Sequence, residues 1–365
     1  MSDWGRADVV GSLLRPVQLR AARAERMAGT LRPAEYKRIE DAAVDAAIAL
    51  QEECGLDVVT DGEMRRMFFT GVITDALDGI EFVTGAPTTW HRAGSEETET
   101  IELPVVVAGK LRRRGSLGTE EFAYARGRAS KRLKVTLPSP LMLSYFWSPE
   151  HSRAAYDDPF EMFADAAEII RAQAAELVAM GCEYIQYDAP ELATIVDPAQ
   201  ADFFDGLGIA PARMLTEGID LLNHCADVEG ARFVMHMCRG NNRGRWLAEG
   251  GYESISRQVF QRATRFDGFA LEYDSPRAGS LEVLRDVPDD KTVILGLVST
   301  KTDEVEAREA VAARLDEAAG YFPREQLALS TQCGFASEDA GNPVTPEHQR
   351  AKLELVAEVA HSCLG

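Results

Sequence analysis

A histidine and a cysteine stand two residues apart at the end of an apolar run, in the stretch HMCRGN (236–241). The residues before them, ARFV (231–234), are typical of a buried strand. Side chains two apart on a strand point to the same face, so the imidazole of His236 and the thiol of Cys238 could reach one metal ion. The simpler alternative is a buried pair without chemistry, because His and Cys also occur as ordinary core residues.

Two further residues of metal-ligand type end apolar runs elsewhere in the chain. Glu272 closes GFALE (268–272), and Cys333 closes LALSTQC (327–333). Imidazole, thiolate and carboxylate are the groups that bind zinc, usually four around one ion. His236, Cys238, Glu272 and Cys333 could therefore hold zinc if the fold brought these distant strand ends together. The spacing alone does not decide between such a site and ordinary core residues.

The elements that would position these residues form a regular alternation. Short apolar, β-branched runs, read as buried parallel strands, occur at 7–12, 56–63, 133–140, 183–190, 231–238, 268–274, 292–299 and 327–334. Helical patterns lie between them, most clearly at 33–55, 158–182 and 303–322. Eight such units predict an α/β fold of the (β/α)8 barrel type, with an open doubly wound sheet as the alternative.

A barrel of this kind places its active site at the carboxyl ends of the strands. Besides the four candidate zinc ligands, those ends hold Gly11, Ser12, Glu63 and Asp188. From the residues alone, Asp188 is interpreted as a helix N-cap and Glu63 as a solvated loop carboxylate.

Residues 80–132 interrupt the alternation. Alternating patterns and glycine turns in this stretch predict a β-rich insertion between strands two and three of one barrel domain, residues 1–365. Its basic cluster, Arg112 to Arg114, is interpreted as a solvated face, and a role over the active site is the alternative.

The composition narrows the class of protein. With 39 Lys and Arg against 59 Asp and Glu, the net charge is −20, which argues against nucleic-acid binding. Six sparse cysteines indicate a reducing, cytoplasmic compartment rather than a disulfide framework. We find no pattern of a signal peptide and no apolar run long enough to predict a membrane span.

Several motifs together resemble a known family. They are VGS, DGE, QYDAPEL, HMCRGN, LEYDSPRAG, LGLVSTKT and QCGF, spread over nearly the whole chain. In this combination the chain resembles the catalytic, C-terminal half of cobalamin-independent methionine synthase, and more closely its short single-barrel relatives. The resemblance implies a zinc ion held by His236, Cys238, Glu272 and Cys333. It also implies an amino-acid substrate held by Gly11, Ser12, Glu63 and Asp188.

The implied reaction is attack of a zinc-bound thiolate on an alkyl carbon, most simply methyl transfer to homocysteine to form methionine. Two departures argue against a folate donor. The chain has no room for the large enzyme's second barrel-like half, and LVSTKT stands where that enzyme has a catalytic histidine. Phe146 and Trp147 lie near the family's pterin-stacking position, with ordinary core packing as an equal alternative. The donor stays open; a corrinoid methyl-carrier protein is one candidate, and a homo-oligomer is allowed.

Three other functions remain to be weighed. A thiol such as coenzyme M could add to an epoxide, as in another branch of the family; Arg15, Arg239 and Lys301 would then be candidates to bind its sulfonate. Decarboxylation of a porphyrin-like acid is argued against by the full set of zinc ligands. A non-catalytic zinc or ligand-binding barrel is the alternative of a different class, and a closed set of four protein ligands would favour it.

Overall fold

The computed structural model describes residues 5–92 and 95–365. Its centre is a six-stranded parallel sheet in the order β13-β12-β11-β9-β8-β7. These strands are β7 (Val135–Pro138), β8 (Tyr184–Asp188), β9 (Arg232–Met237), β11 (Gly268–Glu272), β12 (Thr292–Val298) and β13 (Leu327–Thr331).

Two short segments close this sheet into a ring. β1 (Val58–Val59) pairs in parallel with β6 (Arg132–Leu133), which leads directly into β7. The backbone N–H groups of Asp57 and Val58 donate to Ala7 O, and the N–H of Asp8 donates to Leu329 O on β13. Six strands, β1 and this N-terminal segment make eight parallel positions, so the predicted barrel is confirmed.

The first two predicted strands are shorter than their apolar runs suggest. The run 7–12 contributes one ladder bridge at Ala7, and the run 56–63 contributes only β1. Side chains take the backbone groups that a longer ladder would have used. Thr60 donates through Oγ1 to Gly11 O at 2.7 Å, and Gln51 Oε1 accepts from Thr60 N at 2.9 Å.

Alternation along the strands builds layers inside the barrel. One inner layer is apolar and consists of Val58, Tyr184, Val234, Ala270, Ile294 and Ala328. Two residues further along β8 and β9, toward the carboxyl ends, the same face carries Gln186 and His236, and Asp188 follows. The interior thus changes from apolar to polar toward one end, where chemistry can occur.

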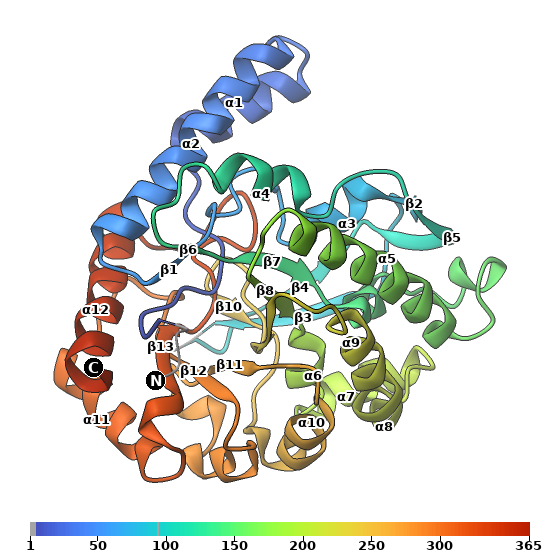
Figure 1. Cartoon of the computed structure of the whole chain (residues 1–365). Coiled ribbons are helices and arrows are strands. Elements are labelled where there is room, and N and C mark those ends of the chain that lie inside the picture. The colour runs from blue at the N-terminus through green and yellow to red at the C-terminus, as the bar shows by residue number, and fades with distance from the viewer. Residues whose placement is uncertain (1–4, 93–94) are drawn as a thin grey trace.

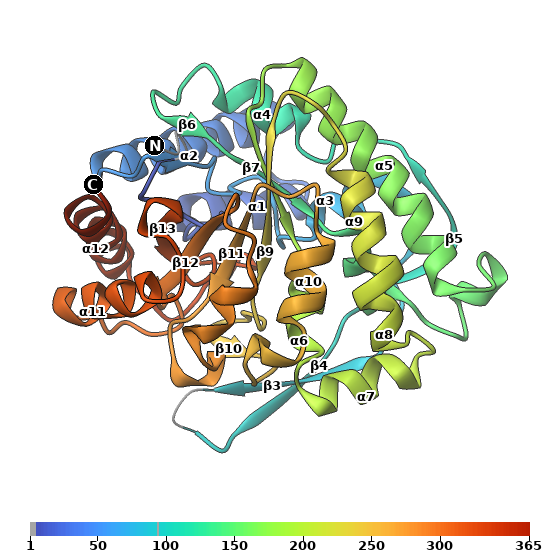
Figure 2. The same ribbon diagram turned by 60° about the horizontal axis from the view of Figure 1, so that its bottom comes forward.

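Helices surround the strands in both views (Figures 1 and 2). The longer ones are α1 (Val17–Met27), α2 (Pro33–Glu53), α5 (Pro159–Ala179), α7 (Pro198–Gly206), α11 (Arg308–Ala319) and α12 (Pro346–Leu364). Short ones are α3 (Gly71–Ala76), α4 (Thr119–Ala125), α6 (Pro190–Thr194), α8 (Pro211–Arg213), α9 (Ile219–Cys225) and α10 (Ser256–Arg262). The three predicted helices correspond to α2, α5 and α11, although α11 begins five residues late. Within the described residues, no helix combines the length and apolarity that a membrane crossing requires.

The 3-10 and π turns are η1 (Pro140–Phe146), η2 (Ser152–Ala154), η3 (Met214–Gly218), η4 (Tyr252–Ser254), η5 (Pro276–Ala278), η6 (Leu281–Asp286) and η7 (Arg324–Gln326). Of these, η1 matters most for the site, because it follows β7 at the carboxyl end of the barrel.

The stretch between β1 and β6 is β-rich, as predicted. β2 (Leu77–Glu81) pairs with β5 (Val106–Arg113), and β3 (Pro87–Arg92) forms a hairpin with β4 (Thr98–Glu102). β10 (Arg245–Trp246), which follows β9, pairs with β3 and joins the hairpin to the barrel mouth (Figure 2). The domain limits 1–365 and the insertion limits 80–132 stay predictions; residues 1–4 and 93–94 within them lie outside the described residues.

Candidate active site

Three of the four predicted metal ligands come together at the carboxyl ends of the strands. One ligand atom each of His236, Cys238 and Cys333 lies within 4.8 Å of the others, and all three residues are buried. The two sulfur atoms are 3.9 Å apart. Neither ring nitrogen of His236 has a hydrogen-bond partner in the described part of the chain. A buried imidazole without a partner, beside two thiols, is a donor set that fits zinc.

The two cysteines ionise as a pair. The S–H of Cys238 can hydrogen-bond to the Cys333 thiolate, and this interaction holds the pKa of Cys333 well below its usual range. His236 and Lys301 lower it further. Sharing the same proton, together with burial, raises the pKa of Cys238 well above its usual range. The site therefore favours one thiolate even without a metal ion, and a bound cation would favour two.

Glu272, the fourth predicted ligand, ends the neighbouring strand and is fully buried. Its Oε2 accepts from the backbone N–H of Arg239 at 2.6 Å, and its Oε1 contacts Arg277 and lies 3.3 Å from Lys301 Nζ. Burial alone would raise the pKa of Glu272, but Lys301, Arg277 and Arg239 lower it to about 2. The carboxylate is ionised and close enough to raise the pKa of Cys238, although it lies outside the group of three ligand atoms.

Asp188 lies next to His236 across the β8–β9 ladder and lines the same cavity. Gln186 Nε2 donates to Asp188 Oδ1 at 2.8 Å, and Lys134 Nζ fixes that amide by donating to Gln186 Oε1 at 2.8 Å. Burial raises the pKa of Asp188 to about 6, with His236 opposing and Glu63 adding to the shift. Gln186 and Lys134 were not predicted as site residues, because the sequence does not distinguish a polar side chain that faces into the barrel from any other polar residue.

Glu63 also reaches this cavity, from the loop after β1. Thr136 Oγ1 donates to Glu63 Oε1 at 2.9 Å, while Glu63 Oε2 is buried with no partner among the described residues. A Cβ at Gly11 would lie 2.6 Å from Glu63 Oε1, so glycine is required for this close approach. Ser12 lines the cavity as well, whereas Gly11 does not.

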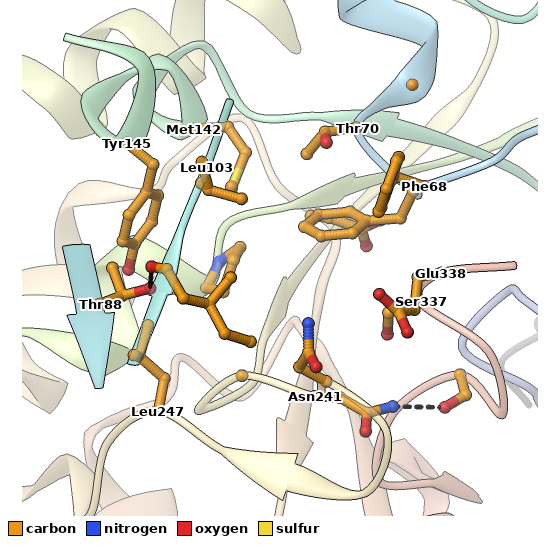
Figure 3. A pocket seen from close by; sticks show the side chains of 18 of the residues that line it. Phe68, Thr70, Thr88, Leu103, Met142, Tyr145, Asn241, Leu247, Ser337 and Glu338 are labelled. Carbon is orange, nitrogen blue, oxygen red and sulfur yellow. Dashed lines mark hydrogen bonds between the residues drawn. The ribbon is translucent and has the colours of Figure 1, made fainter. Parts of the chain in front are cut away.

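The cavity above these residues has a volume of about 530 Å³. His236, Cys238 and Cys333 lie on its wall together with Asp188 and Glu63. The rest of the wall comes from the loop 67–71, the β3–β4 hairpin, η1 and the loops after β9 and β13; Figure 3 shows Phe68, Thr88, Leu103, Met142, Tyr145, Asn241, Leu247, Ser337 and Glu338 around it. The predicted insertion therefore helps to enclose the site.

Other predicted contacts do not reach the cavity. Arg15 is buried and donates to the backbone carbonyls of Leu13, Ala336, Glu63 and Arg66, so its guanidinium shapes the loops instead. The Trp147 indole N–H donates to Leu207 O at 3.0 Å, and its ring is core packing, although Phe146 beside it lines the cavity. The basic residues Arg112, Arg113 and Arg114, like Arg239 and Lys301, are also absent from the cavity wall.

Several residues that line the cavity were not predicted from the sequence. Asn241 could have been predicted, because it closes the HMCRGN stretch. In the structure its Nδ2 donates to Gly334 O at 2.8 Å. Phe68, Trp90 and Leu103 had none, because apolar residues in an insertion reveal a site only when the hairpin's position is known.

The fold and the site define a (β/α)8 barrel with a cluster of imidazole and thiol groups at its mouth. Residues 7–361 match the family model described as "Cobalamin-independent synthase, Catalytic domain". The chain belongs to this family, which is one of methyltransferases acting on small molecules.

Among its relatives, YxjH of Bacillus subtilis is 35% identical over 98% of this chain and 94% of that protein. A methionine synthase of Saccharolobus solfataricus is 26% identical over 90% of this chain and 87% of that one. The chain also matches 40% of the length of a 5-methyltetrahydropteroyltriglutamate–homocysteine methyltransferase of Rhodococcus jostii, at 26% identity over 89% of this chain.

Solved structures agree on the fold. A B12-independent methionine synthase from Shewanella, solved with selenomethionine, superposes with a TM-score of 0.76 at 20% identity, covering 98% of this chain and 97% of that one. A putative vitamin-B12-independent methionine synthase from Listeria monocytogenes gives a TM-score of 0.71 at 27% identity, with the same coverage.

Proposed function

We propose that this protein transfers a methyl group to the thiol of homocysteine, forming methionine, at a zinc ion. His236, Cys238 and Cys333 would hold the ion, with Glu272 as the fourth ligand. The observation that carries the proposal is the convergence of three ligand atoms within 4.8 Å on the wall of a cavity large enough for substrates. Membership of a methionine synthase family supports the choice of homocysteine.

Zinc bound there would lower the pKa of the substrate thiol, so that a nucleophilic thiolate exists near neutral pH. The protein's own residues would supply orientation. Asp188 and the unpartnered Oε2 of Glu63 line the same cavity and offer negative charge to the substrate ammonium. The cavity has room for both substrates and would bring the sulfur and the methyl carbon together, which replaces an encounter in solution by a positioned one.

Glu272 has the weakest geometric support among the four ligands. Its contacts with Arg277 and Lys301 keep it ionised, and a carboxylate oxygen has lone pairs for more than one partner. We propose that Glu272 would be the fourth ligand of a zinc ion held there, and the ligand that a substrate thiolate would replace.

The coenzyme M alternative has little support from this cavity. Each basic side chain considered for its sulfonate is engaged elsewhere: Arg15 with backbone carbonyls, Arg239 with Gly250 O, and Lys301 with Glu272. A purely structural zinc site is disfavoured because the three ligands line an open cavity rather than a closed core.

The test is the metal content of the purified protein, followed by X-ray absorption at the zinc edge with and without homocysteine. We expect about one zinc per chain, with a new sulfur ligand at ~2.3 Å when homocysteine is added. A protein without zinc, or a zinc site that does not change with homocysteine, would contradict the proposal. Alanine in place of homocysteine is the control, because it has the amino-acid groups and no thiol.

A further inference from the structure

The charge on the cavity wall is strongly one-sided. Its carboxylates are Glu63, Asp75, Glu99, Glu102, Asp188 and Glu338. Three of these carboxylates are paired with arginines: Glu338 with Arg243, Glu63 with Arg66 at 3.6 Å and Glu99 with Arg245 at 2.6 Å. Asp75, Glu102 and Asp188 have no ion pair among the described residues and leave the wall with excess negative charge. Such a wall repels an anion carrying several carboxylates and attracts a cation.

Two residues of the cavity wall carry buried acceptors without partners. Glu63 is 3% exposed and Asn241 is 6% exposed, and both line the cavity. The Oε2 of Glu63 and the Oδ1 of Asn241 have no hydrogen-bond partner within the described chain. Buried acceptors of this kind are costly unless a ligand satisfies them. Glu63 Oε2 is assigned above to the substrate ammonium, so Asn241 Oδ1 is the acceptor left for the second substrate, and methyl groups attached to a cationic atom can satisfy it through their polarised C–H bonds.

Aromatic rings supply the other half of a cation site. Phe68, Trp90 and Tyr145 line the cavity from three different elements, and Figure 3 shows Phe68 and Tyr145 on opposite sides of it. The faces of such rings attract ammonium and sulfonium groups within about 6 Å of the ring centre. Phe68 is also 47% exposed, so it stands at the entrance rather than in the core.

The end of β12 offers no proton donor to the cavity. Ser299 Oγ donates to Asp274 Oδ2 at 2.7 Å, and Thr300 Oγ1 donates to Gln332 Oε1 at 2.6 Å; neither lines the cavity. Tyr145 does line it, and burial raises the pKa of its hydroxyl above the usual range. This arrangement suits a leaving group that departs without taking a proton.

We propose that the methyl donor is a small organic cation, a methylated sulfonium or quaternary ammonium compound, bound between Phe68, Trp90, Tyr145 and the acidic wall. The inference rests on the proposed function. A lone pair of the homocysteine thiolate forms the new S–CH3 bond, and the bond from that methyl to the cationic atom breaks. Its electron pair stays on the leaving atom, which departs as a neutral thioether or amine, so no proton and no redox partner is needed.

The experiment measures methionine formed by the zinc-loaded protein from homocysteine with a panel of donors. Trimethylsulfonium and S-methylmethionine are the sulfonium probes, and trimethylglycine is the ammonium probe. Methyl iodide, which is neutral and reactive, tests thiol activation alone. We expect at least one cationic probe to give a homocysteine-dependent rate at least tenfold above that with 5-methyltetrahydrofolate or methylcobalamin.

The outcomes separate the two proposals. Methylation by methyl iodide with no turnover of any cationic probe would overturn the cationic donor and leave thiol activation standing. Faster turnover with the folate or with methylcobalamin than with the cations would also overturn it. If zinc-dependent methylation by methyl iodide fails as well, the proposed function itself is wrong.

Two variants test the binding site for the active cation. Phe68→Leu keeps apolar bulk but removes the ring, and should lower kcat/KM for the cation roughly three- to tenfold, more than for methyl iodide. Glu102→Gln should raise KM for the cation several-fold, and this effect should shrink in high salt. Glu81→Gln, on β2 of the same insertion but outside the cavity wall, is the matched control. Equal effects of Glu102→Gln and Glu81→Gln would contradict an electrostatic role for the wall.

Discussion

At the scale of single residues, the two cysteines differ although they lie side by side. The pKa of Cys333 is lowered by the hydrogen bond with Cys238 and that of Cys238 is raised, so Cys333 is the thiol of the pair that favours the thiolate form that a zinc ion would bind. Cys333→Ser should therefore lose zinc, to less than about a tenth of an equivalent after dialysis, and lose methyl transfer, since a neutral hydroxyl is a poor zinc ligand. Elemental analysis and circular dichroism measure metal and fold. Cys182→Ser is the control, because Cys182 is also buried but lies outside the ligand cluster. A full equivalent of zinc in Cys333→Ser would show that Cys333 is not a zinc ligand.

Asp188 is the residue that we expect to bind the substrate's ammonium group. Asp188→Asn keeps the side chain's shape and its contact with Gln186 but removes the charge. KM for homocysteine should rise about ten- to a hundredfold, the range for losing a hydrogen bond between charged groups. Zinc content should stay the same. Steady-state kinetics alongside metal analysis checks both, and unaltered KM would exclude the ammonium contact.

At the scale of elements, the first turn of α6, directly after β8, contains a buried acid, Glu191. Ser139 Oγ donates to Glu191 Oε1 at 2.5 Å, and Glu191 Oε2 has no partner among the described residues. Burial raises the pKa of Glu191 from 4.5 to about 8, with Ser139 opposing the shift. A raised pKa means that the folded protein holds this proton more tightly than the unfolded chain does.

The stability contributed by this proton is therefore complete below about pH 4.5 and is lost as pH rises toward about 8. Glu191→Gln stays neutral throughout, so its Tm should exceed that of the wild type increasingly between these two pH values. Thermal unfolding across this range, compared for the two proteins, measures the difference. Parallel Tm curves would show that the pKa of Glu191 is the same in the folded and the unfolded protein, which would contradict the raised value.

At the scale of the whole molecule, the barrel closes through very few backbone bonds. Asp57 reinforces this seam because its Oδ2 accepts from the N–H of Arg6 at 2.7 Å and of Ala7 at 3.0 Å. Asp57→Ala should lower the free energy of unfolding by about 1–3 kcal/mol in urea titrations. Asp316→Ala, which removes an exposed ion pair with Arg324, should change it by less than about 1 kcal/mol. An equal loss of unfolding free energy in the two variants would mean that the hydrogen bonds of Asp57 stabilise the protein no more than an exposed ion pair does.

The geometry of the barrel explains which residues of the candidate site could be predicted from the sequence. Parallel strands bring their carboxyl ends to one face, so His236, Cys238, Cys333 and Asp188 could be placed together from strand ends alone. The surroundings of Glu272 could not, because they depend on where Arg277 and Lys301 turn after their strands.

Side chains within the loops were harder to place than those on the strands. The sequence leaves Trp147 open between a stacking contact and core packing. In the structure Met142, Tyr145 and Phe146 of η1 line the cavity, while Trp147 is buried in the core. A 3-10 turn rotates successive side chains by about 120°, and a sequence pattern does not fix the starting angle.

The pairing of β3 with β10 has an evolutionary consequence. The ligand cluster lies at strand ends of the barrel, whereas the hairpin that faces it pairs with β10 through a two-residue ladder. Under the functions proposed above, we expect substitutions of Thr88, Trp90 or Leu103 to alter which donor is accepted and to leave thiol activation intact. Related barrels could thus come to use different methyl donors through changes in this hairpin alone. The hairpin is therefore the segment to exchange in order to change the methyl donor of the enzyme.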